Sequence, residues 1–260
     1  MAERYTSLVA LTLDRPLDDV GAVVRAAVAA GDIDRQSAVR DPVEAAEVVW
    51  GGRMQRAVVR RVEGDGGEPL LRTEAYVGGE GIRVGLRRQA ELLRGLARHV
   101  APAAVTGVVD LSSGEQHDLA WLERVASDGA THDDAIIVHT EGTGTHWTHS
   151  HGAARFDVPD LELYGLPKAR IEGAARAIRH VHEQLLAVGL RGDLTLPDGT
   201  PVFLVPALES WQRLPLDWPG IGRAGQTRPG HDGPRATLSI LGKSRLGRYP
   251  RDLKGVLPHL

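Results

Sequence analysis

Imidazole and carboxylate side chains gather between residues 136 and 167, in the segment IIVHTEGTGTHWTHSHGAARFDVPDLELYGLP. Along an extended strand, side chains two positions apart share one face of the sheet and stand roughly 7 Å apart. His149 and His151 therefore point the same way, and so do Asp160 and Glu162 in the run PDLEL. Imidazoles and carboxylates on adjacent strands suit Zn²⁺, Mn²⁺ or Fe²⁺. The spacing predicts a divalent-metal site on this hairpin.

One more histidine comes from the segment 168–190, which has the periodicity of an amphipathic helix. His182 falls inside the apolar stripe of this segment, which consists of Ile171, Ala175, Ile178 and Leu185. Two interpretations stay open. His182 is either a satisfied core histidine or a further group of the metal site, which it reaches if this helix covers the hairpin.

Two functions from different classes fit these residues. In the first, the chain is a metal-dependent enzyme, most simply a hydrolase, in which the ion lowers the pKa of a bound water. Its ligands are then His149, His151 and Asp160, and its catalytic residues are Glu162, His182 and Arg155. Arg155 holds an anionic group of a small-molecule substrate.

In the second function, the chain is a non-catalytic binding, immunity or scaffold module, and the hairpin is its interface with a protein partner. Alternatives also stay open for His149 and His151 themselves. They have either a structural polar role or a part in acid-base chemistry without a metal.

The stretch from VVDLSSG to PDLEL resembles the core of uncharacterised bacterial families of unknown function. Their hallmark is W-x-H-T-H-G-L-x-R-x-G-x-x-E-L-E, preceded by a V-D strand and a helix that contains Trp. The matching residues are Trp147, His149, His151, Gly152, Arg155 and Glu162, with Asp110 and Trp121 upstream. The chain departs from the pattern at Ser150, Ala153, Ala154, Asp157 and Asp160. The resemblance implies no activity, and it favours a structural or interface role for the carboxylate strand.

Strands and helices alternate irregularly along the chain. Hydrophobic periodicity and turn residues predict strands and helices in this order: strand 5–14, helix 16–31, hairpin 47–64 with 68–79, helix 83–100, strand 103–113, helix 114–127, hairpin 134–142 with 145–156, strand 159–165, helix 167–190, hairpin 194–207 and strand 236–241. For the helix that begins after Ser113, we expect Glu115 and Asp118 in the first turn, where the helix dipole favours anions.

This order predicts an α+β fold, with mixed or mainly antiparallel sheets, helices packed on one face and hairpins interleaved with helices, because strict β-α alternation is absent. We expect one domain over residues 1–215, with any sub-boundary near 101–103. Residues 216–260 are rich in Pro, Gly and Arg. They are expected to form a tail that is either packed on the domain or partly mobile.

The composition narrows the classes of function. A formal net charge of −3 gives no field that would attract nucleic acid or an anionic membrane, so neither is an expected partner. Zero cysteines exclude thiolate ligands and a Cys nucleophile, and they fit a reducing compartment. No apolar run reaches the ~20 residues of a membrane span, and the first residues make a poor secretory signal. A cytoplasmic protein of unspecified oligomeric state is expected.

Overall fold

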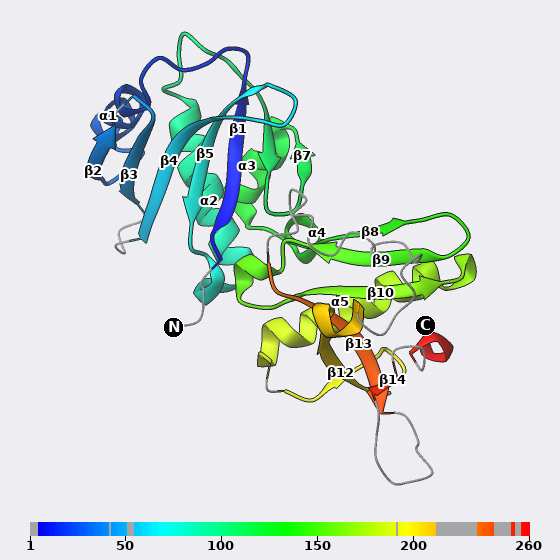
Figure 1. Ribbon diagram of the computed structural model, residues 1–260. Coiled ribbons are helices and arrows are strands. Elements are labelled where there is room, and N and C mark those ends of the chain that lie inside the picture. The colour runs from blue at the N-terminus through cyan, green and yellow to red at the C-terminus, as the bar shows by residue number, and fades with distance from the viewer. Residues whose placement is uncertain are drawn as a thin grey trace. The chain divides into compact units, whose positions relative to one another are not determined.

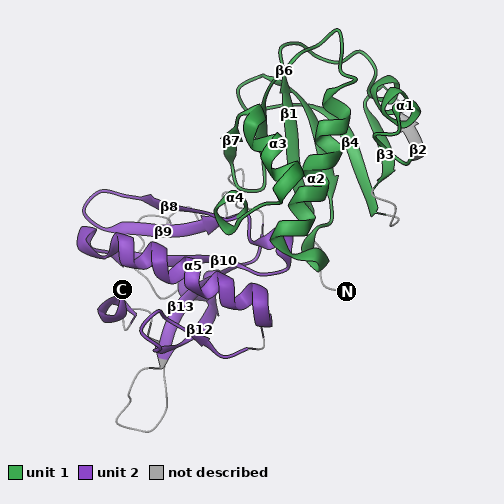
Figure 2. Cartoon of the chain, turned by 180° about the vertical axis from the view of Figure 1, so that it is seen from behind, with its two compact units in different colours: residues 1–135 green, residues 136–260 purple. Residues whose placement is uncertain are grey.

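The computed structural model describes residues 5–41, 43–50, 55–190, 192–211, 233–241, 251–252 and 256–260. The chain forms two compact units, Met1–Ala135 and Ile136–Leu260 (Figure 2). This division differs from the single unit expected over residues 1–215. The sub-boundary expected near 101–103 falls inside the first unit, between α2 (Gly81–Ala97) and β6 (Val105–Asp110).

The first unit contains an antiparallel sheet (Figure 1). Its strands in spatial order are β2 (Arg35–Asp41), β3 (Ala45–Trp50), β4 (Gln55–Glu63), β5 (Pro69–Ala75), β1 (Ser7–Leu13), β6 and β7 (Glu115–His117). The run expected as one strand, 47–64, contributes to two strands, β3 and β4. Residues 51–54 between them lie outside the described residues.

The helices of the first unit are α1 (Val20–Ala30), α2, α3 (Leu119–Asp128) and the short α4 (His132–Ala135). In α1, Asp19 caps the N-terminus by accepting a hydrogen bond from the amide of Ala22 at 3.0 Å. In α2, the buried apolar residues include Leu86, Ala90, Leu93 and Leu96. Gln89 of α2 donates to the carbonyl of Ser7 at 3.0 Å and thereby ties this helix to β1.

The start of α3 is a correction to the sequence analysis. Glu115 does not lie in a first helical turn, because Glu115–His117 pairs with β6 as β7. The helix begins after Asp118, whose carboxylate accepts from the amide of Trp121 at 2.8 Å. Aspartate and serine are similarly favourable N-cap residues, so Asp118 can cap this helix in place of the predicted Ser113.

The second unit contains a mixed sheet, in which only β10 and β13 pair in parallel among the described strands. Its strands in spatial order are β11 (Leu194–Thr195), β12 (Pro201–Pro206), β13 (Arg235–Leu241), β10 (Asp160–Leu166), β9 (His146–His151) and β8 (Ile137–Glu141), with β14 (Arg251–Asp252) paired to β13. The helices are α5 (Ile171–Val188) and α6 (Ala207–Trp211). Short 3-10 turns lie at Ala154–Phe156, Lys168–Arg170 and Leu257–His259 in this unit, and at Gly78–Glu80 in the first unit.

The long helix α5 packs along β8, β9 and β10 (Figure 1). Both units therefore combine helices with mostly antiparallel sheets, and the α+β prediction is confirmed. Within the described residues, no helix has the length and apolar character needed to cross a membrane.

Part of the expected tail belongs to the sheet. Strand β13 lies between β10 and β12, so residues far along the chain complete the second unit. Residues 216–232, 242–250 and 253–255 of the expected tail, and residues 212–215 before it, lie outside the described residues.

Candidate functional site

The strand register places two of the predicted site residues, His149 and Glu162, in one row across the second sheet. His149 of β9 is paired with Glu162 of β10 on one side and with His139 of β8 on the other. Directly opposed residues share a face, with Cβ atoms about 5 Å apart. Trp147 and His151 lie on this same face, because they are two positions from His149. The predicted facing of His149 and His151 therefore agrees with the structure.

Aromatic rings lie next to one another along this face, some of them stacked and others edge-on. The ring of Tyr164 lies parallel to that of Trp147 at 6.1 Å between centroids, and Trp147 stacks on His149 at 3.7 Å. His151 meets His149 edge-on at 4.7 Å. His139 lies 5.1 Å from His151 and 6.1 Å from His149. We call this set, together with Asp160, Glu162 and Arg235, the polar face.

The carboxylate of Glu162 is held by three donors on the polar face. Its Oε2 accepts from the indole N–H of Trp147 at 3.0 Å and from the hydroxyl of Tyr164. Its Oε1 accepts from Arg235 at 3.3 Å. Both carboxylate oxygens are thus engaged, and the adjacent guanidinium already supplies the positive charge that a metal ion would bring.

The carboxylate of Asp160 is also hydrogen-bonded, but to donors at and just after the end of β9. Its Oδ1 accepts from the hydroxyl of Ser150 at 3.1 Å and from the amide of Ala153 at 3.0 Å. Ser150 Oγ in turn accepts from the amide of Leu161 at 2.8 Å. These bonds fasten the end of β9 to the start of β10.

Burial raises the pKa of Asp160 to about 6, and this effect is opposed by Arg235 and by the two hydrogen bonds to Oδ1. The nearby carboxylate of Glu162 adds to the rise. The buried guanidinium of Arg235 lies close to Asp160 as well as to Glu162, and Asp160 takes up a proton more readily than a free aspartate does.

His182 and Arg155 lie in the core of the second unit. The ring of His182 is fully buried on α5, and its Nε2 donates to the carbonyl of Pro159 at 3.2 Å. This contact fits the interpretation of His182 as a satisfied core histidine. Arg155 lies in the turn after β9 and is 1% exposed, with its guanidinium 5.3 Å from the ring centre of Phe156.

The apolar stripe expected on α5 is slightly rotated. Ile178, His182 and Leu185 are buried as expected, whereas Ile171 and Ala175 are half-buried. Their places in the core are taken by Ala174, Ala177 and Val181. The rotation keeps His182 inside.

The structure therefore brings His149, His151 and Glu162 together and adds His139 and Arg235, which were not among the predicted site residues. Across the described ranges, no group of three or more His, Asp or Glu side chains is arranged to hold a metal ion. The signal for His139 was available, because a hairpin turn around Gly142 places it opposite His149. Arg235 had no such signal, since its strand follows a long segment without clear periodicity.

Three comparisons with known proteins, against family models, curated proteins and solved structures, found no match.

Proposed function

We propose that this chain is a non-catalytic binding module, in which the polar face is a rigid internal support and the hairpin β8–β9 forms the interface. One observation carries the proposal. The six predicted site residues are between 0% and 6% exposed, and the carboxylates among them are engaged with neighbouring donors. A catalytic group has to reach its substrate within hydrogen-bond distance, so buried and occupied groups favour support over catalysis.

The outer edge of β8 is the part of the hairpin that a partner can meet. Among the described strands, β8 stands at the end of the sheet order and pairs with β9. Thr140 and residues 142–145 at the turn are exposed. A strand at the end of a sheet is the usual place where another chain adds a strand through backbone N–H and C=O groups. The partner we infer is an extended segment of another protein, which adds a strand beside β8.

Selection from displayed random peptides tests this interface. The peptides should be about ten residues long, the upper length of a typical strand. We expect the purified chain to enrich peptides whose binding is lost in Thr140→Lys, because a lysine on an edge strand opposes strand addition. Thr143→Lys is the matched control, since it adds the same charge at an exposed turn position. Absence of enrichment, or equal binding to Thr140→Lys, would overturn the proposal.

A second candidate is metal-assisted hydrolysis, which one observation favours. The rings of His139, His149 and His151 converge at 4.7 to 6.1 Å between centroids, and three imidazoles with a water are a known catalytic zinc set. His139 is half-buried and is the most accessible of the three. The bound ion would lower the pKa of that water. Its test is the metal measurement that closes the Discussion.

A further inference from the structure

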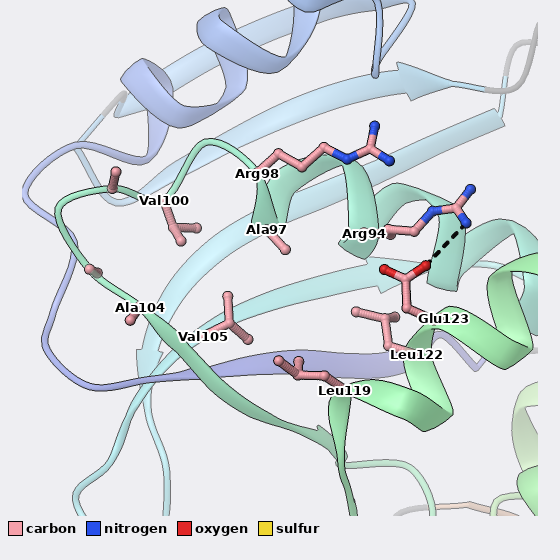
Figure 3. Close-up of a pocket in the computed structure, with 11 residues that line it drawn as sticks. Arg94, Ala97, Arg98, Val100, Ala104, Val105, Leu119, Leu122 and Glu123 are labelled. Carbon is pink, nitrogen blue, oxygen red and sulfur yellow. Dashed lines mark hydrogen bonds and ion pairs between the residues drawn. The ribbon is translucent and has the colours of Figure 1, made fainter.

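A cavity of about 310 Å³ opens on the first unit, between the end of α2, the following loop and the start of α3 (Figure 3). This volume is at the small end of the range of about 300–1,000 Å³ that ligand pockets occupy. Its residues all lie between positions 94 and 123, so the pocket is formed within one unit.

Most of the wall is apolar. The aliphatic side chains of Val100, Val105, Leu119 and Leu122 surround the hollow (Figure 3). Leu119 is 42% exposed, although it is a large hydrophobic residue. An apolar ligand that covered Leu119 would remove this apolar surface from water, which favours binding.

Charged groups line the rest of the pocket, and the guanidinium of Arg98 is paired with Asp32 at 2.7 Å. Arg94 and Arg98 contribute two guanidinium groups, and Glu123 contributes one carboxylate. Arg94 pairs with Glu123 at 3.4 Å, and the glutamate side chain is 63% exposed (Figure 3). An exposed ion pair of this kind contributes little to stability, so a ligand carboxylate can displace Glu123 from Arg94 at small cost.

We propose that this pocket binds a small amphipathic carboxylate, such as a short acyl chain. The apolar chain would lie against Leu119 and Leu122, and the carboxylate would replace Glu123 as the partner of Arg94. Arginine pairs well with a carboxylate because its planar N–H groups can form two parallel hydrogen bonds.

Calorimetric titration with octanoate tests the proposal. We expect saturable binding by the wild-type chain, and binding weaker by about tenfold for octanol, which lacks the charge. Arg94→Gln should weaken octanoate binding by a similar factor. Glu123→Gln should leave it unchanged or strengthen it, because the competing carboxylate is gone.

Arg87→Gln is the matched control, since Arg87 lies on the same helix and pairs with Glu91 outside the pocket. It should bind octanoate as the wild type does. The proposal is overturned if octanoate shows no saturable binding, if octanol binds equally well, or if Arg94→Gln and Arg87→Gln behave alike.

Discussion

His149 and Glu162 are cross-strand partners in the β9–β10 ladder, and both side chains are fully buried. Their shared neighbour is Trp147, which stacks on the imidazole and donates its indole N–H to the carboxylate. The indole thus connects the aromatic stack to the buried ion pair between Glu162 and Arg235. Substitution of either His149 or Glu162 should therefore lower the free energy of unfolding.

Glu162→Gln should destabilise the chain strongly. The substitution removes the charge that compensates Arg235, whose side chain is only 7% exposed. Breaking a buried ion pair by neutralising one partner costs about 3–5 kcal/mol. Urea unfolding at neutral pH measures the loss. Glu172→Gln on α5 is the control, because the side chain of Glu172 is 94% exposed, and it should stay within about 0.5 kcal/mol of the wild type. Equal stability of the two variants would contradict this role of Glu162.

Asp160→Asn should change how stability depends on pH. Because the pKa of Asp160 is raised to about 6 in the folded chain, from a reference value of 3.8, the folded state takes up a proton before the unfolded state does. The contribution of Asp160 to the free energy of unfolding therefore rises, by up to about 3 kcal/mol, as pH falls from above 6 to below 4. Asparagine cannot titrate, so the variant should lose this rise while its amide oxygen still accepts from Ser150 and Ala153.

The comparison requires unfolding curves for the wild type and the Asp160→Asn variant at pH 7 and pH 4. Asp160→Ala serves as the control, because it removes both hydrogen bonds and should be less stable than Asp160→Asn at both values. If the wild type and Asp160→Asn differ by the same free energy at pH 7 and pH 4, Asp160 does not titrate as stated.

The first unit should show the opposite pH dependence through Asp134. Burial opposes ionisation of this carboxyl, but hydrogen bonds from Arg124 and Thr131 outweigh it and lower the pKa of Asp134 to about 2. Its contribution to stability is present above pH 3.8 and is lost as pH falls through about 2. After allowance for solvent screening, this contribution is on the order of 1–2 kcal/mol.

Asp134→Asn should remove that contribution at pH 7. Trp121 reports it, because its indole N–H donates to Asp134 at 3.0 Å, so unfolding can be followed by fluorescence. The exposed neighbour Asp133 supplies the control variant Asp133→Asn, which should leave the acid dependence unchanged. Identical acid unfolding of the wild type and Asp134→Asn would contradict the assignment.

The sequence was enough to predict which polar residues share a face of the sheet, but not which hydrogen-bond and ion-pair partners they have. Period-two alternation places His149 with His151 and Asp160 with Glu162 whatever strand lies beside them. Which carboxylate meets which donor depends on register and on β13, whose Arg235 is 73 positions from Glu162 along the chain. An ion pair between residues so far apart along the chain leaves no signal in the local spacing of residue types.

The other differences between the predicted and the observed structure arise where the local sequence allows more than one arrangement. Ser113 and Asp118 are both good N-caps, and the choice was decided by pairing of the intervening residues with β6. His182 was recognised inside an apolar stripe, but its contact with the carbonyl of Pro159 depends on how α5 packs. Periodicity gives the buried side of a helix and leaves the polar contacts of that side undetermined.

The central claim is that the polar face is a structural support. Its most direct test is the metal content of the purified, untagged chain. We would measure this content by plasma mass spectrometry after incubation with zinc and gel filtration. Wild type, His149→Ala and His146→Ala should be compared, because His146 lies on the same strand with its side chain on the opposite face. We expect no stoichiometric metal in any of the three, and a loss of stability in His149→Ala alone. About one ion per chain in the wild type and in His146→Ala, absent from His149→Ala, would contradict the claim and favour the hydrolase.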